Sequence, residues 1–329
     1  MPLAVKSLIL LILLILVLTG IWGWTQHRAQ LREAQAETAY PPEGQFVTVD
    51  GTRVHGVVMG CKAGDAPDLV LIHGASGNTR DMTFSLAPRL AEEYRVIVLD
   101  RPGLGYTDRI NGTGATITQQ AALLQKAAAK LGADQPIVLG HSYGGAVALA
   151  WAVTRPDHIA GLVDVSGAAK PWEGGISTYY KVLSNPVLGP AVIPFITAYV
   201  DDSRVEDAVR EIFTPQEPPE GYLSHIGAGL TLRRHSLRAN ALQRANLLGE
   251  IEALHTRYGE ISAPVEILHG TADTTVGLSI HSVPLADQIA AAQFTPLEGI
   301  GHMPHHADED AVVAAIQRAA TRAGLRKAD

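Results

Sequence analysis

The chain has 329 residues, of which 47% are hydrophobic and 18% charged; this is typical of a packed globular protein and excludes an intrinsically disordered one. Its formal net charge of -7 argues against a nucleic-acid-binding protein, because no basic stripe is present to neutralise phosphates. The one cysteine, Cys61, excludes an intrachain disulfide and a cysteine-based zinc cluster. The length suits one large α/β domain with an insertion.

The N-terminal stretch is strongly apolar. Residues 8–18 form an uninterrupted apolar run, which continues to Trp22 and Trp24. A helix over residues 8–24 would be roughly 26 Å long at about 1.5 Å per residue, near the lower limit for crossing a bilayer. Tryptophan is frequent at membrane–water interfaces. We therefore expect residues 1–24 to be an uncleaved single-pass signal anchor; the alternative is a cleaved signal peptide, although no small-x-small site follows promptly.

Charges on the two sides of this segment nearly balance, with Lys6 before it and Arg28 and Arg32 after it. We expect the N-terminus to stay inside and the globular part to lie on the extracytoplasmic side. Residues 25–44 are rich in Gln, Ala and Glu and end near Pro41-Pro42, so we expect a helical or flexible tether that is not part of the fold.

The globular part shows strands that alternate with helices. A β-hairpin is expected over residues 46–59, with Asp50-Gly51 as its turn. Further strands are expected at 68–72, 95–99, 137–139, 161–165, 264–268 and 293–297, and helices at 79–91, 116–131 and 143–154. This alternation predicts a mostly parallel, doubly wound α/β sheet, in which reactive groups gather at the carboxyl ends of the strands.

One strand end carries a serine between two glycines. In Gly140-His-Ser142-Tyr143-Gly144 a strand turns sharply into a helix, and a strained backbone at Ser142 leaves no room for a Cβ at Gly140 or Gly144. The pattern predicts that the Ser142 hydroxyl stands clear of the sheet. The N–H of Tyr143, in the first helical turn, would point at an oxyanion formed there.

Two neighbouring strand ends carry further motifs, His73-Gly74-Ala75 and the run from Asp100 to Gly105. With these motifs in this order and spacing, residues 45–325 resemble the serine-nucleophile branch of the α/β-hydrolase superfamily. The resemblance implies a second oxyanion-hole N–H from Ala75, with structural roles for His73 and Gly74. A serine at the turn excludes the relatives that carry an aspartate nucleophile, such as haloalkane dehalogenases and epoxide hydrolases.

The resemblance also implies an acid and then a histidine downstream of the serine. Asp273 follows the strand at 264–268 in the form G-x-x-D, and His302 follows the strand at 293–297. We expect His302 to accept the proton of Ser142 and Asp273 to orient His302. Asp164, at the end of the sixth strand, is the rival acid.

Other polar residues are expected to be structural. Asp100 should fix its turn, and His269 should be a strand-end residue. His302, His305 and His306 suggest a metal site, but no spaced carboxylate or cysteine completes it, so we expect a solvated loop with no metal and no cofactor. His55, His141 and His225 should be packed or exposed rather than ligands.

An insertion separates two parts of the expected domain. Residues 45–167 and 263–329 should form the core, and residues 168–262 a helical lid. Residues 182–200 are apolar but interrupted by three prolines, which argues against a membrane span; they form either the core of the lid or a surface for lipid-like acyl chains. Arg233, Arg234, Arg238 and Arg244 should lie on a solvated helix face.

These expectations indicate a membrane-anchored serine hydrolase that acts on a small-molecule, apolar acyl substrate, most simply a carboxylic ester, through an acyl-enzyme. An acyltransferase, a C–C bond hydrolase or a cofactor-free haloperoxidase with the same triad is the alternative. A tethered binding protein with an inactive pocket is the non-enzymatic alternative, and a complete triad argues against it.

Overall fold

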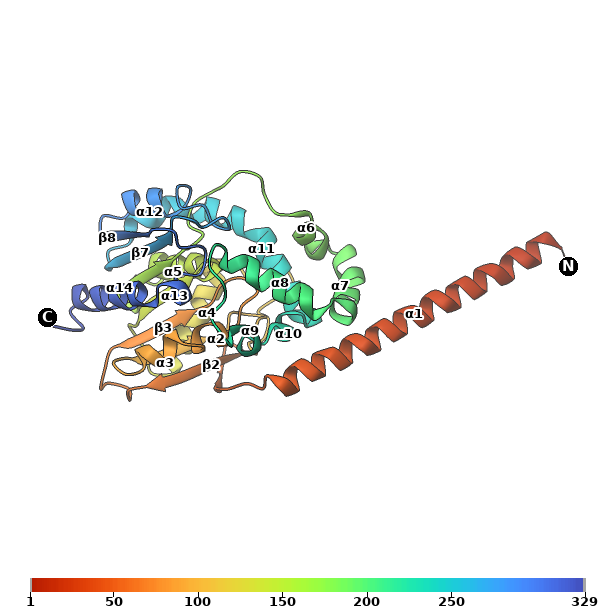
Figure 1. The fold of residues 1–329 in the computed structure, drawn as a ribbon, viewed down its shortest axis with the longest axis horizontal. Coiled ribbons are helices and arrows are strands. Elements are labelled where there is room, and N and C mark those ends of the chain that lie inside the picture. Colours follow the sequence, from red (N-terminus) through yellow and green to blue (C-terminus); the bar gives the residue numbers. More distant parts are fainter. Residues whose placement is uncertain (1, 328–329) are drawn as a thin grey trace.

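An eight-stranded sheet lies at the centre of the domain in this computed structural model, which describes residues 2–327 (Figure 1). The strands run in the spatial order β1-β2-β4-β3-β5-β6-β7-β8. β2 is antiparallel to β1 and β4, and all other neighbours are parallel. The mostly parallel sheet is therefore confirmed. The strands are β1 (Gln45–Val49), β2 (Thr52–Gly60), β3 (Asp68–Ile72), β4 (Arg95–Leu99), β5 (Ile137–His141), β6 (Gly161–Val165), β7 (Val265–Gly270) and β8 (Ala292–Leu297).

Helices cover both faces of the sheet, because its central strands are apolar on both sides. One core lies between the sheet and α4 (Ile117–Lys130), α5 (Tyr143–Thr154) and α12 (Ser282–Gln288). The other lies under α3 (Leu86–Leu90) and α14 (Glu309–Arg322). Short helices α2 (Thr79–Thr83) and α13 (Pro304–Ala307) lie near the carboxyl ends of the strands.

The helix expected over residues 79–91 is broken into α2 and α3. Pro88 explains the break, since proline has no N–H for the bond to the residue four positions earlier and is tolerated only in the first turn of a helix. A helix that restarts at Leu86 places Pro88 in its first turn.

Six helices between β6 and β7 form a cap over the carboxyl edge of the sheet (Figure 1). They include two apolar helices, one amphipathic helix, two single turns and a long helix that returns the chain to the sheet. They are α6 (Thr178–Ser184), α7 (Leu188–Tyr199), α8 (Asp202–Phe213), α9 (Tyr222–His225), α10 (Ala228–Thr231) and α11 (Arg234–Leu254).

The N-terminal helix α1 (Leu3–Ala39) is continuous over 37 residues and is long and apolar enough to cross a membrane, a test that a signal sequence also passes. Its apolar first half projects away from the domain (Figure 1). Its second half packs against the cap, with Thr25 and Ala29 fully buried. Arg28 Nε donates to the carbonyl of Ala198, and Arg32 Nη1 donates to that of Val200, over 2.8 and 2.7 Å. The expectation that residues 25–44 stand outside the fold is therefore wrong for this helix.

The arginines at the start of α11 explain why α1 docks there. Arg233 is 2% exposed and pairs with Glu37 of α1 at 2.9 Å. Arg234 pairs with Glu33 at 2.7 Å, and its backbone N–H donates to the same carboxylate over 2.8 Å. The prediction that these arginines lie on a solvated helix face is therefore wrong. Their partners come from a segment some two hundred residues away in the sequence.

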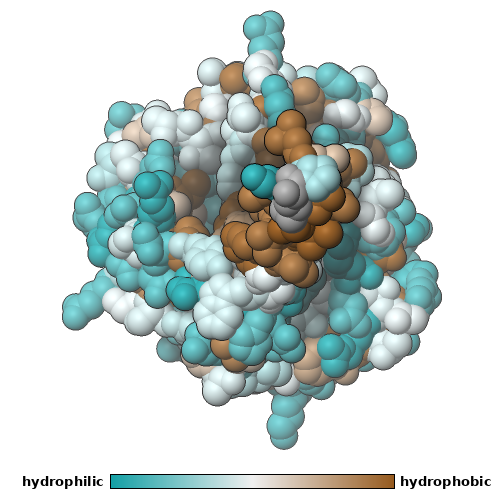
Figure 2. All heavy atoms as spheres, turned by 90° about the vertical axis from the view of Figure 1, so that its right-hand side faces the viewer, coloured by the Kyte–Doolittle hydropathy of each residue, from teal (hydrophilic) through white to brown (hydrophobic). Residues whose placement is uncertain are grey.

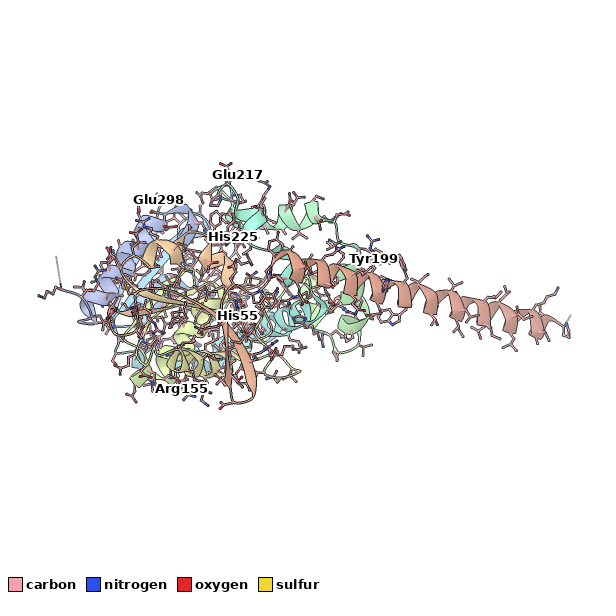
Figure 3. All side chains as sticks on the ribbon, turned by 90° about the horizontal axis from the view of Figure 1, so that it is seen from below. His55, Arg155, Tyr199, Glu217, His225 and Glu298 are labelled. Carbon is pink, nitrogen blue, oxygen red and sulfur yellow. The ribbon has the colours of Figure 1, made fainter. Side chains whose placement is uncertain are left out.

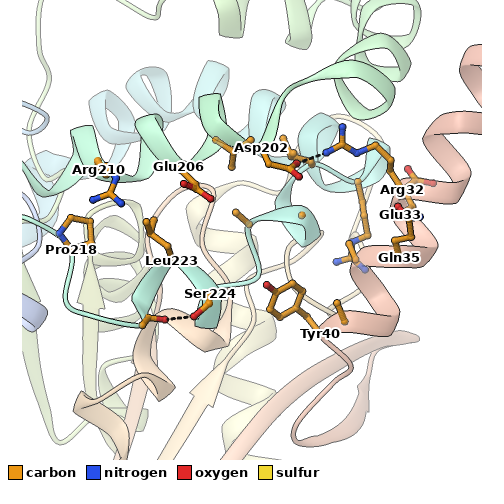
Figure 4. Close-up of a pocket in the computed structure, with 18 of the residues that line it drawn as sticks. Arg32, Glu33, Gln35, Tyr40, Asp202, Glu206, Arg210, Pro218, Leu223 and Ser224 are labelled. Carbon is orange, nitrogen blue, oxygen red and sulfur yellow. Dashed lines mark hydrogen bonds and ion pairs between the residues drawn. The ribbon is translucent and has the colours of Figure 1, made fainter.

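A hollow of about 740 Å³, lined by both polar and apolar residues, lies between α1 and the cap (Figure 4). Its walls include Tyr40, Glu206 and Arg210, and Arg32 pairs with Asp202 at its rim.

Glu33→Ala should loosen the second half of α1, because it removes a part-buried carboxylate that accepts both side-chain and backbone N–H groups. Charged hydrogen bonds contribute about 2 kcal/mol, so we expect roughly thirtyfold faster amide hydrogen exchange across residues 25–39. Gln30→Ala, at an exposed position of the same helix, is the matched control. Equal exchange in the two variants would show that the ion pair does not hold the helix.

Candidate active site

The turn between β5 and α5 has the strain that its sequence predicts. Ser142 has φ 55° and ψ -115°, a region that side chains rarely adopt. A Cβ at Gly140 would lie 2.2 Å from the carbonyl oxygen of Gly144, and a Cβ at Gly144 would lie 2.3 Å from that of Ile72. Only glycine fits at these two positions. The turn places Ser142 at the wall of a cavity, 5% exposed.

Two backbone N–H groups beside Ser142 are free to bind an anion. Ala75 follows β3 and lines the same cavity, and Tyr143 is the first residue of α5. Within residues 2–327, neither N–H donates a hydrogen bond. Both are therefore available to an oxyanion at Ser142, and the positive end of α5 adds to the local potential.

Asp273 and His302 are in direct contact. His302 Nδ1 donates to Asp273 Oδ2 over 2.7 Å, and the other carboxylate oxygen accepts the N–H groups of Thr275 and Val276 over 2.8 and 2.9 Å. Burial opposes the charged form, yet the hydrogen bonds from His269 and His302 hold the pKa of the Asp273 carboxyl well below its usual range. Asp273 is therefore a carboxylate at neutral pH.

His302 lines the same cavity as Ser142. In the described part of the chain, the structure has no hydrogen bond between the Ser142 hydroxyl and the His302 ring. Such bonds are often long in unliganded hydrolytic sites and tighten when substrate is bound.

His269 is a second histidine on Asp273. Its Nε2 lies 3.0 Å from Asp273 Oδ2 and 2.8 Å from the carbonyl of Val276, so this nitrogen carries the proton. Its Nδ1 accepts the hydroxyl of Ser282 over 2.6 Å. The structural role expected of His269 therefore includes a direct contact with Asp273.

His73 and Asp100 fix the loops that follow β3 and β4. Asp100 accepts the N–H of Thr79 over 2.7 Å and that of Tyr106 over 2.9 Å, and it contacts His55 Nδ1 at 2.7 Å. These bonds are of the kind expected of a residue that fixes the turn. Burial and the charge of Arg101 lower the pKa of His73 to about 4, so the ring is neutral; it donates to the carbonyl of Gly74 and accepts the N–H of Arg101.

His305 and His306 are buried rather than solvated, so that expectation is wrong. Both contact Asp81 of α2, at 3.3 and 2.9 Å, and Tyr222 donates to Asp81 over 2.8 Å. Asp81, His305 and His306 have the donor types of a metal site and lie within 4.8 Å of one another. The carboxylate that sequence reasoning missed comes from a helix more than two hundred residues earlier.

His141 links this cluster to His302. Its Nε2 donates to the carbonyl of His302 over 2.8 Å, and its ring packs on the rings of His302 and His305. Burial and the neighbouring histidines lower the pKa of His141 well below its usual value. A neutral His141 can thus hold the backbone of His302 in place.

The cavity has a volume of about 860 Å³ and is mostly apolar. Its floor carries Ser142 and His302, and its outer walls come from the cap. The cap side chains are mainly aliphatic and aromatic, among them Tyr179, Tyr180, Leu183, Phe195, Ile196, Val205, Val209, Ile212 and Leu237. His225, labelled in Figure 3, is half-buried and does not line this cavity.

Asp164, the rival acid, lies fully buried in β6. Burial raises the pKa of its carboxyl to about 7, and it makes no hydrogen bond to His302 among the described residues.

Comparisons with known proteins agree with the fold. A family profile described as alpha/beta hydrolase fold matches residues 67–308. A dihydrolipoyllysine-residue acetyltransferase component of an acetoin cleaving system from Cupriavidus necator is 37% identical over a matched region. This region covers 41% of this chain and only 33% of that protein. A 2-hydroxy-6-oxononadienedioate/2-hydroxy-6-oxononatrienedioate hydrolase from Klebsiella pneumoniae is 28% identical over 73% of this chain and 83% of its own. The crystal structure of a bacterial membrane phospholipase A superposes with a TM-score of 0.65 at 21% identity, over 98% of this chain and 99% of that one.

Asp164→Asn should change how stability depends on pH. Because the pKa of Asp164 is raised from 3.8 to about 7 in the folded chain, its contribution is present at low pH and is lost as the pH rises through 7. Between pH 5 and pH 8 the wild type should lose about 3 kcal/mol that the variant does not lose, measured by denaturant unfolding at both values. Asp134→Asn, at an exposed position, should behave as the wild type. Parallel pH dependences of wild type and Asp164→Asn would contradict the shift.

Proposed function

The chain belongs to the alpha/beta hydrolase fold family, and we propose that it is a serine hydrolase that cleaves a carboxylic ester or related acyl bond. The observation that carries the proposal is the contact of Asp273 with His302 at 2.7 Å on the wall of the cavity that holds Ser142. The strained turn at Ser142 and the two free N–H groups beside it support the same reaction.

In the proposed reaction the Ser142 hydroxyl oxygen attacks the acyl carbonyl carbon while His302 Nε2 takes its proton. The carbonyl oxygen becomes an oxyanion that accepts the N–H groups of Ala75 and Tyr143. The C–O bond to the alcohol breaks, and His302 returns the proton to that alcohol. Water then attacks the acyl-enzyme with His302 as base, which releases the acid and restores Ser142.

Asp273 keeps His302 in the tautomer that this cycle needs. A carboxylate that accepts the Nδ1 proton leaves Nε2 unprotonated and facing the cavity, and it stabilises the imidazolium that forms in each transition state. The contacts of Asp273 with His269, Thr275 and Val276 keep it charged and fixed.

An apolar acyl group is the substrate portion that this cavity favours, since aliphatic and aromatic cap side chains form most of its wall. We propose that α1 is a membrane anchor that holds the catalytic domain on the extracytoplasmic side.

Cleavage of a C–C bond beside a ketone by the same three residues is the second candidate. It is favoured by the similarity to the Klebsiella hydrolase, whose name describes a dicarboxylate substrate, and Arg204 and Arg244 in the cavity wall supply cations for carboxylates. A 2-hydroxy-6-oxo dienedioate that is turned over faster than any ester would favour this candidate.

Ser142→Ala should abolish hydrolysis of p-nitrophenyl esters by the full chain in detergent, with kcat reduced on the order of a million-fold, because no nucleophile remains. A fluorophosphonate should label the wild type and not this variant. Ser203→Ala, at an exposed position of α8, is the matched control and should keep both activities. Labelling that persists in folded Ser142→Ala would place the reactive serine elsewhere.

Asp273→Asn and Asp164→Asn separate the two candidate acids. The first removes the acceptor of the His302 Nδ1 proton and should lower kcat by about ten thousand-fold. The second should leave kcat within about threefold of the wild type, because the protonated carboxyl and the amide have the same shape. The reverse order of effects would assign the role to Asp164.

A further inference from the structure

The segment that forms α6 and α7 is unusually apolar for an exposed part of a cap. Residues 178–199 contain a single charged side chain, Lys181. One side of the helix pair packs on α11, through Leu183 and Ile193 against Leu237 and Ala241. The other side exposes large apolar groups: Val187 is 74% exposed, Leu188 48% and Phe195 40%. The segment thus supports the cap on one side and leaves an apolar edge uncovered on the other.

This edge is not a second membrane span. The two helices meet at 111°, and their inner side is committed to the cap. A helix that is packed on a folded domain and exposes an apolar edge is instead suited to lie at a membrane interface.

The contacts of α7 with α1 place the apolar edge at the depth expected for the membrane–water interface. The apolar run of α1 ends at Trp24, and tryptophans mark the interface. Phe195 of α7 lies against Trp22, with ring centroids 6.0 Å apart, and Tyr199 shares a hydrogen bond of 3.2 Å with Thr25. Figure 3 shows Tyr199 beside α1. α7 therefore lies beside the last turns of the apolar run.

The overall shape agrees with this placement. In Figure 1, α6 and α7 lie at the edge of the domain from which the apolar half of α1 projects. Figure 2 looks at this face along α1, whose apolar side chains stand out from surroundings that are mostly hydrophilic or intermediate. A bilayer that holds α1 would meet this face first.

The same two helices form part of the wall of the cavity. Tyr179, Tyr180 and Leu183 of α6 and Phe195, Ile196 and Tyr199 of α7 line it, together with Ser142 and His302. Phe195 is both exposed and part of the wall, so the apolar edge is continuous with the interior.

From these observations we infer that the exposed edge of α6 and α7, centred on Val187, Leu188 and Phe195, rests in the bilayer that holds α1, and that an acyl substrate passes from this leaflet between the two helices to Ser142. The second half of the inference rests on the proposed hydrolysis, and the contact with the bilayer rests only on the proposal that α1 is a membrane anchor. An acyl chain that follows this route stays in apolar surroundings, so its CH₂ groups avoid unfavourable exposure to water.

The bilayer contact is tested by fluorescence quenching, a measurement that does not depend on enzymatic activity. Val187→Cys in a Cys61→Ser background is labelled with an environment-sensitive NBD group, and the full chain is placed in phosphatidylcholine–phosphatidylglycerol vesicles that carry a nitroxide-labelled lipid. We expect strong quenching at position 187, comparable to a label at Leu10→Cys in the apolar run. Leu325→Cys, 40% exposed at the opposite end of the domain, should remain unquenched. Equal quenching at 187 and 325 would overturn the inference, as would shielding of the 187 label that depends on protein concentration, because a second copy would then cover the edge.

The route of the substrate is tested by Val187→Glu/Leu188→Glu, since neither residue lines the cavity. Hydrolysis of a soluble short-chain ester should be unchanged, and hydrolysis of a long-chain ester embedded in the vesicles should fall at least about tenfold, because two charges oppose burial in the interface. Leu325→Glu should change neither rate. Equal rates of the double variant and the wild type on the embedded ester would overturn the route. Quenching at 187 in a protein that hydrolyses neither ester would support the bilayer contact and refute the proposed function, so the two failures are distinguishable.

Discussion

The rest of the site depends on the hydrogen bonds that the buried carboxylate of Asp273 accepts. A charge removed from water is unfavourable unless hydrogen bonds replace its solvation, and here His302, His269 and two backbone N–H groups do so. The two histidines are themselves fixed: His269 by Ser282 and Val276, and the backbone of His302 by His141. The position of the His302 ring is therefore determined by a network that extends over β7, α12 and β5, and not by a single pair.

Much of the sheet could be predicted, because its signals are local. The apolar runs that form β3, β4 and β6 have the bounds read from the sequence, and the glycines around Ser142 are needed for contacts within a few residues and with the neighbouring strand. The assignment of Ser142, Asp273 and His302 relied on order along the chain. The structure adds the contact between Asp273 and His302, and their catalytic roles remain predictions.

The features that sequence reasoning missed involve partners that are far apart in the chain. Arg233 and Arg234 looked like a solvated cluster, because nothing near them reveals that Glu37 and Glu33 of α1 lie opposite. His305 and His306 looked solvated for the same reason, since Asp81 comes from α2. A charged side chain is predicted to be exposed until its partner is known, so buried ion pairs are the elements that local patterns predict worst.

The docking of α1 has a consequence for the proposed membrane-bound state, since it would fix how the domain is oriented on the membrane. A flexible tether, one of the two forms expected for residues 25–44, would let the cap face any direction. Instead, Arg28, Arg32 and the two glutamate–arginine pairs hold α1 against α7 and α11. Arg233 also donates to the carbonyl of Gly105, in the loop whose turn Asp100 holds through the Tyr106 N–H. The anchor is thereby connected by successive contacts to the loops at the carboxyl edge of the sheet. Since Phe195 meets α1 and also lines the cavity, a bilayer that holds α1 as proposed would meet the cap, and not the opposite side of the sheet.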